Sequence, residues 1–78
     1  MNPQSKKKPK DTELTEFGDQ LRALREKAGM TQESLADSAG LHWSYVGQVE
    51  RGERNLTYKS ILSLAHGLDV PAASLMPN

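Results

Sequence analysis

The stretch TQESLADSAGLHWSYVGQVERG, residues 31–52, contains two short apolar patterns with a glycine between them. Each pattern repeats every three or four residues and therefore marks one face of a helix, the first over residues 32–39 and the second over residues 43–51. The residues on the two inward faces are Leu35, Ala36, Ala39, Val46 and Val49. Thr31 is placed to cap the first helix, Gly40 permits a sharp turn, and Leu41 is expected to fill the space between the helices. The stretch predicts two short helices packed across a tight turn.

Apolar spacing predicts further helices on both sides of this pair. On the N-terminal side, residues 13–28 carry an apolar stripe that Gly29 would terminate. On the C-terminal side, a helix is expected to begin after the capping residue Thr57 and to end at Gly67. Pro71 suits the first position of a short helix over residues 71–76. Neither a strand pattern nor a long repeat competes with these helices, so we predict an all-α fold of five short helices.

A helix, a turn containing glycine and a second amphipathic helix form the pattern typical of a helix-turn-helix motif. In that motif the first helix crosses the phosphate backbone and the second enters the major groove, which is wide enough to admit it. The outward-facing residues of the second predicted helix are Trp43, Ser44, Gly47, Gln48 and Arg51. Double-stranded DNA is therefore the expected ligand. One helix reads only a few base pairs, so a homodimer on two half-sites is expected.

The segments FGDQLRALREKAGMTQESLA, AGLHWSYVGQVERGERN and ILSLAHGLDV lie between residues 17 and 70. In order and spacing, the region from residue 17 to residue 76 resembles the Cro/phage-repressor type of helix-turn-helix domain, the XRE family. The segment ERGERNLTYKS and the chain length also resemble controller proteins of restriction–modification systems. The resemblance implies a five-helix repressor-like fold, homodimeric binding to palindromic operators and regulation of transcription.

The resemblance also implies which residues bind DNA, and they are Gln32, Trp43, Ser44, Tyr45, Gly47, Gln48, Arg51, Arg54 and Asn55. By position, Gln32 and Tyr45 match contacts to the backbone, Trp43 and Ser44 match contacts to base edges, and Gly47 and Gln48 face the groove. The residues from Arg51 to Asn55 match the helix end and loop that clamp phosphates.

Three positions depart from this pattern or add to it. Trp43 stands where many relatives have arginine or glutamine, and its apolar ring suits a thymine methyl group better than guanine. Alternatively, Trp43 is a partly buried packing residue. His42 stands where Ser, Asp or Thr would usually cap the second helix, so a weaker cap is expected there. Arg25 and Glu50 resemble the internal ion pair of the family and are expected to be structural.

Size and composition bound the function. A chain of 78 residues has room for one domain with a thin core, which weighs against a deep catalytic cleft. It contains no cysteine, and His42 and His66 lack companions at ligand spacing, so no metal, cofactor or small-molecule ligand is expected. Apolar runs are too short to span a bilayer, and the N-terminus lacks the apolar stretch of a signal peptide. These features predict a cytoplasmic protein without a membrane partner.

The charge is unevenly distributed although the formal net charge is zero. Residues 1–10 contain four lysines and no acid, whereas the rest of the chain has an excess of acidic side chains. Residues 1–11 are expected to form a disordered basic tail, and residues 12–78 the DNA-binding domain. The tail is either a solvated leader or an arm that contacts DNA phosphates.

Two other classes of protein compete with the DNA-binding regulator. An antitoxin-type or phage repressor-type protein, whose main role is partner binding with autoregulation, remains an alternative. An enzyme is not expected, because the sequence lacks a nucleophile–base pair, a phosphate-cradling glycine loop and a paired-carboxylate motif. Self-association is expected through the apolar side chains of the last two helices, namely Leu64, Leu68, Val70, Leu75 and Met76.

Overall fold

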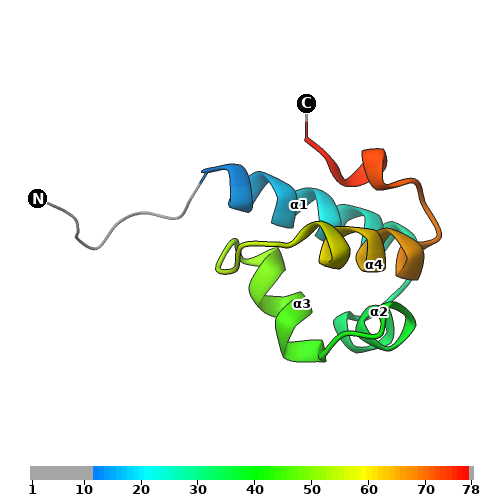
Figure 1. Ribbon diagram of the computed structural model, residues 1–78. Helices are drawn as coiled ribbons and strands as arrows, with labels where there is room; N and C mark the ends of the chain where they lie inside the picture. The colour runs from blue at the N-terminus through cyan, green and yellow to red at the C-terminus, as the bar shows by residue number, and fades with distance from the viewer. Residues whose placement is uncertain (1–11, 78) are drawn as a thin grey trace, which may run out of the picture.

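The computed structural model describes residues 12–77, and within that range the fold is all-helical. Its helices are α1 (Thr12–Lys27), α2 (Gln32–Ala39), α3 (Trp43–Glu50) and α4 (Tyr58–Leu68), followed by the 3₁₀ helix η1 (Ala72–Leu75). Figure 1 shows α2 and α3 together at the end of the molecule away from the C-terminus, with α1 and α4 above them in this view. The predicted basic tail over 1–11 lies outside the described residues.

Local chemistry explains where the central helices begin and how the chain turns between them. The Thr31 hydroxyl accepts a hydrogen bond from the Ser34 backbone N–H, and the Ser34 hydroxyl accepts one in return from the Thr31 N–H. This reciprocal capping box satisfies two donors that the first turn of α2 would otherwise leave unpaired. Gly40 then takes the left-handed conformation, with φ of 71°, and donates to carbonyl groups at the end of α2. The tight turn predicted between the two helices is confirmed.

All four α-helices and η1 contribute to a single apolar core. Its buried side chains are Phe17, Leu21, Leu35, Ala36, Val46, Val49, Leu64, Ala65, Leu68 and Leu75. Leu41 packs against this cluster from the turn between α2 and α3, as its position predicted. The inward faces predicted for the two central helices are confirmed, except that Ala39 is only partly buried.

The expected end of α4 was wrong by a small but informative amount. The helix continues past Gly67 to Leu68, and Asp69 takes the left-handed conformation that ends it, with φ of 59°. Gly67 lies instead at a contact with α2, where an added Cβ atom would stand 3.0 Å from Leu35 Cδ1 and 3.0 Å from Ala39 Cβ. Its small size is required for helix packing, and its backbone freedom is not used there.

The fifth element was predicted as an ordinary helix and is a single 3₁₀ turn. The Ser74 N–H donates to the carbonyl of Pro71, three residues back, which is the 3₁₀ pattern. Pro71 precedes the turn with extended ψ and is not its first helical residue. Buried Leu75 anchors the segment, and the Gln20 side chain of α1 donates to the Ser74 carbonyl over 2.9 Å. A four-residue element held by one leucine is too short for an α-helix to propagate.

α1 and α3 approach each other closely at Gly18. A Cβ atom at this position would lie 2.5 Å from the carbonyl oxygens of both Val49 and Glu50. Those atoms belong to a helix backbone and cannot move aside without displacing α3. Glycine at residue 18 therefore sets how closely α3 packs against α1.

We expect Gly18→Ala to lower the free energy of unfolding by about 1–3 kcal/mol, because the new methyl group overpacks the α1–α3 contact. Denaturant unfolding followed by circular dichroism measures the change. Glu16→Ala is the control, because it alters an exposed side chain of the same helix and should change stability by less than about 0.5 kcal/mol. Equal stability of Gly18→Ala and the unsubstituted protein would contradict the close approach.

Candidate nucleic-acid interface

The outer face of α3 begins with a histidine cap and an exposed tryptophan. His42 Nδ1 accepts a hydrogen bond of 3.2 Å from the Ser44 backbone N–H, so His42 caps the helix with its side chain. The helix start is therefore capped by a side chain, although none of the usual Ser, Asp or Thr caps is present. Trp43 is 56% exposed, and its ring stacks on His42 with centroids 5.8 Å apart. The exposure argues against a packing role for Trp43 and leaves its ring available to a ligand.

A buried ion pair lies behind this face, between α1 and α3. Arg25 Nε donates to Glu50 Oε2 over 2.6 Å, and Arg25 Nη2 donates to Glu50 Oε1 over 3.1 Å. The side chains are only 11% and 3% exposed, and these hydrogen bonds raise the pKa of the Arg25 guanidinium further above its usual range. Arg25 also donates to the Met30 carbonyl, in the loop between α1 and α2. The internal pair implied by the family resemblance is confirmed.

The same carboxylate holds the first residue of α2 against α3. Gln32 Nε2 donates to Glu50 Oε1 over 3.0 Å, so the Gln32 side chain lies across the middle of α3. A Cβ atom at Gly47 would stand 3.3 Å from both Gln32 Oε1 and Arg51 Nη1. Gly47 is buried under these side chains. Its role in the structure is to leave room for Gln32.

Two arginines lie at the C-terminal end of α3. Arg54 Nη1 donates to Gln48 Oε1 over 3.0 Å, and the Arg54 guanidinium lies 5.2 Å from the centre of the Tyr45 ring, within cation–π range. Arg51 makes two hydrogen bonds to Glu53, which raise its pKa above the usual arginine value. Both guanidinium groups are exposed, so these contacts contribute little to stability and leave the charges accessible to a polyanion.

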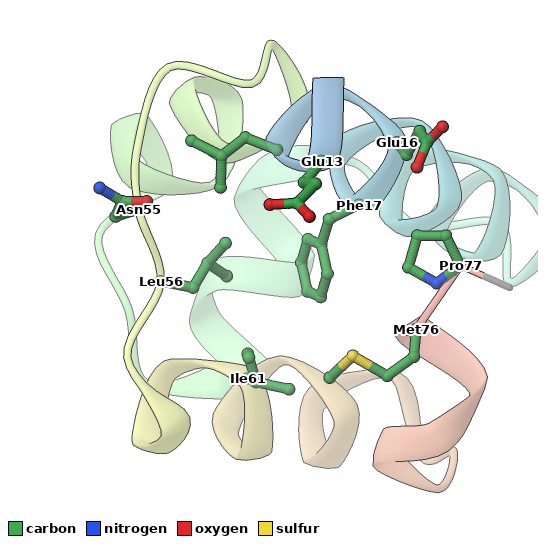
Figure 2. Close-up of a pocket in the computed structure, with 9 residues that line it drawn as sticks. Glu13, Glu16, Phe17, Asn55, Leu56, Ile61, Met76 and Pro77 are labelled. Atoms are coloured by element: carbon green, nitrogen blue, oxygen red, sulfur yellow. The ribbon is translucent and has the colours of Figure 1, made fainter. Parts of the chain in front are cut away.

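We refer to this surface as the α3 surface, and it is formed by Gln32, Trp43, Ser44, Tyr45, Gln48, Arg51 and Arg54. The structure brings these predicted residues together on α3, its flanking loop and the start of α2. Asn55 is exposed and borders a different feature, a groove that Leu56, Ile61 and Met76 line with Phe17 (Figure 2). The contacts of His42 and Glu53 were not anticipated from the sequence.

The rest of the described chain offers no competing chemistry. Over residues 12–77, no three His, Asp or Glu side chains lie close enough together to hold a metal ion. None of the helices described is both long and apolar enough to cross a membrane.

Comparisons with known proteins agree with this geometry. The family described as "Helix-turn-helix domain" matches residues 16–75. Control protein C.SmaI of Serratia marcescens is 38% identical over 60 residues, covering 77% of this chain and 71% of that protein. Control protein C.BamHI of Bacillus amyloliquefaciens is 36% identical over 61 residues, covering 77% of this chain and 75% of its own length. The crystal structure of the restriction-modification controller protein C.AhdI from Aeromonas hydrophila superposes with a TM-score of 0.83 at 47% identity, over 85% of this chain and all of that chain.

The chain therefore belongs to the helix-turn-helix family of DNA-binding transcriptional regulators. Within that family, it is similar to the controller proteins of restriction–modification systems. These relatives are regulators and not enzymes.

We expect Arg25→Ala and Glu50→Ala each to lower the free energy of unfolding by about 3–5 kcal/mol, because each leaves a buried charge without its partner. Thermal and denaturant unfolding of the two variants measures the loss. Arg22→Ala is a matched control on the same helix, since it removes an exposed pair with Glu26 and should cost less than about 1 kcal/mol. A loss no larger than that of the control would show that the Arg25–Glu50 pair is not a determinant of the fold.

Proposed function

We propose that this protein is a sequence-specific transcriptional regulator in which α2 and α3 form the helix-turn-helix and α3 enters the major groove. The observation that carries the proposal is the two-sided character of α3. Val46, Val49 and Glu50 are buried, whereas Trp43 and Arg51 are exposed and Ser44 and Gln48 are half-buried outside the core. The controller proteins among the relatives support a role as controller of a restriction–modification system, acting in the cytoplasm where the operator DNA is located.

The α3 surface divides into base-reading and phosphate-binding parts. Ser44 and Gln48 carry the donors and acceptors that base edges recognise, and Trp43 offers an apolar ring to a thymine methyl group. Arg51 and Arg54 are cations at the end of the helix, where contacts to phosphate fix the position of the protein without reading sequence. We also assign Gln32, Tyr45 and Asn55 to contacts with the DNA backbone. Gly47 acts by making room for the Gln32 side chain.

We further propose that the protein binds a palindromic operator as a homodimer. The surface expected from the sequence needs correction, because Leu64, Leu68 and Leu75 are buried in the monomer core and cannot contact a partner. The large apolar side chains left exposed on α4 and beyond η1 are Tyr58, Leu62 and Met76. Figure 2 shows Met76 and Ile61 pointing into the neighbouring groove, which extends this apolar face. Binding to two half-sites requires that a second copy covering this face place the two α3 helices on one side of the DNA, about 34 Å apart.

We expect Gln48→Ala to relax base preference at one position in each half-site, at a cost of about 1–3 kcal/mol with the preferred base. Arg51→Ala should weaken binding to all sequences alike. The slope of the logarithm of the binding constant against the logarithm of the salt concentration should fall by the amount that about one phosphate contact contributes. Binding is measured on the operator selected from a random duplex pool and on its single-base variants. Ser38→Ala, an exposed change on α2 outside the α3 surface, is the control. Loss of base preference in Arg51→Ala but not in Gln48→Ala would reverse the two assignments.

We expect Leu62→Glu to weaken self-association at least about tenfold, since it places a charge in an apolar interface. Analytical ultracentrifugation gives the dimer dissociation constant, and operator binding should weaken in parallel. Ala23→Glu adds the same charge at an exposed position of α1 and should leave the dimer unchanged. If the unsubstituted protein sediments as a monomer at tens of micromolar and binds an operator as one copy, the dimer proposal is wrong.

A further inference from the structure

The first turn of α3 holds two contacts to one histidine nitrogen. His42 Nδ1 lies 3.2 Å from the Ser44 backbone nitrogen and 2.8 Å from Ser44 Oγ. The His42 ring is held in this position by the cap itself and by stacking on Trp43. The same serine is assigned to base reading, so the hydrogen-bonding state of its hydroxyl affects which bases it can pair with.

The backbone contact determines which atoms donate. A backbone N–H can only donate, so Nδ1 must present its lone pair to Ser44, and the ring proton is on Nε2. An Nδ1 atom without a proton cannot donate to Ser44 Oγ. The hydroxyl, at the shorter of the two distances, must therefore donate its own proton to Nδ1.

As a result, the Ser44 hydroxyl can only accept a hydrogen bond from a ligand. A free serine hydroxyl can donate or accept, so serine ordinarily pairs with either kind of base atom. Once its proton is directed to His42, Ser44 Oγ has only lone pairs to offer to a ligand. The donors that DNA exposes in the major groove are the N4 amino group of cytosine and the N6 amino group of adenine.

We propose that His42 is a specificity-determining residue that makes Ser44 an obligate hydrogen-bond acceptor, so that α3 selects adenine or cytosine over guanine or thymine at the base facing Ser44. The inference rests on the proposed function, because it requires α3 to lie in the major groove. His42 itself acts through Ser44 and needs no contact with DNA.

The test begins with selection of duplexes from a random pool by the full-length protein and by Ser44→Ala. The position at which the two selected sequences differ is the base read by Ser44, and we expect adenine or cytosine there. Dissociation constants on duplexes that differ at that position should favour adenine or cytosine about five- to tenfold, the effect of one net hydrogen bond. The ratio is taken on one protein preparation, so any unfolded fraction cancels.

Two substitutions of the histidine then separate its effect on Ser44 from its effect on helix stability. His42→Ala removes the acceptor, frees the hydroxyl to donate, and should reduce the preference to within about twofold. His42→Asn is the matched control, because its side-chain carbonyl still caps the helix and still accepts from Ser44, and it should retain the preference. Circular dichroism confirms that the helices remain formed in each variant.

The possible outcomes distinguish failure of the His42 proposal from failure of the proposed function. If the unsubstituted protein selects no DNA sequence, the proposed function fails, and the inference fails with it. If an operator is selected but Ser44→Ala selects the same one, only the inference is overturned. It is also overturned if the base at the Ser44 position is guanine or thymine, or if His42→Ala keeps the full preference.

Discussion

The ion pair between Arg25 and Glu50 connects all three helices on which the α3 surface depends. Arg25 belongs to α1, Glu50 belongs to α3, and Gln32 of α2 donates to the same carboxylate. Apolar contacts in the core stabilise the domain but are non-directional, so they tolerate small rotations of one helix against another. A hydrogen-bonded pair of buried charges does not tolerate such rotations, because displacement would leave each charge without a partner. The pair therefore fixes the orientation of α1 relative to α3, and the same carboxylate holds the start of α2 through the Gln32 side chain.

Stability and recognition are assigned to opposite sides of α3. The inner side carries Val46, Val49 and Glu50, which contact the core and the ion pair. The outer side carries Ser44 and Gln48, whose hydrogen bonds in the free protein are made only to exposed neighbours. Under the proposed function, a substitution on the outer side changes the preferred DNA sequence without a cost to the core. Regulators of one fold can thus acquire different operators.

Apolar periodicity predicted most of the fold because helix packing requires it. The bounds of α2 were obtained from spacing, a capping threonine and a glycine turn, all of which act within a few residues. The end of α4 and the nature of η1 were missed, because Gly67 serves a contact with a distant helix and the last element is too short to show a period. The dimer surface was misjudged for a related reason. Spacing identifies an apolar face but does not show whether other parts of the same chain already bury it. Leu64, for example, is fully buried in the core of the monomer.

Residue types at the α3 surface could also be anticipated, but their contacts could not. Which side chains point outward follows from helical geometry once Val46 and Val49 are placed inward. The hydrogen bonds from Gln32 to Glu50 and from Arg54 to Gln48 depend on rotamers and on helix positions that no local pattern encodes. The Arg25–Glu50 pair was identified by family resemblance and not by spacing.

The bond between Arg54 and Gln48, together with the position of Arg54 near the Tyr45 ring, has a consequence for the entropy of association. A long side chain that is immobilised on binding loses about 0.5–1.5 kcal/mol of rotamer freedom. Here part of that freedom is already lost when the domain folds, so less remains to be lost when a ligand arrives. The α3 surface is thus partly preorganised, and the DNA binding proposed for it would be less opposed by ordering than binding through a flexible basic segment.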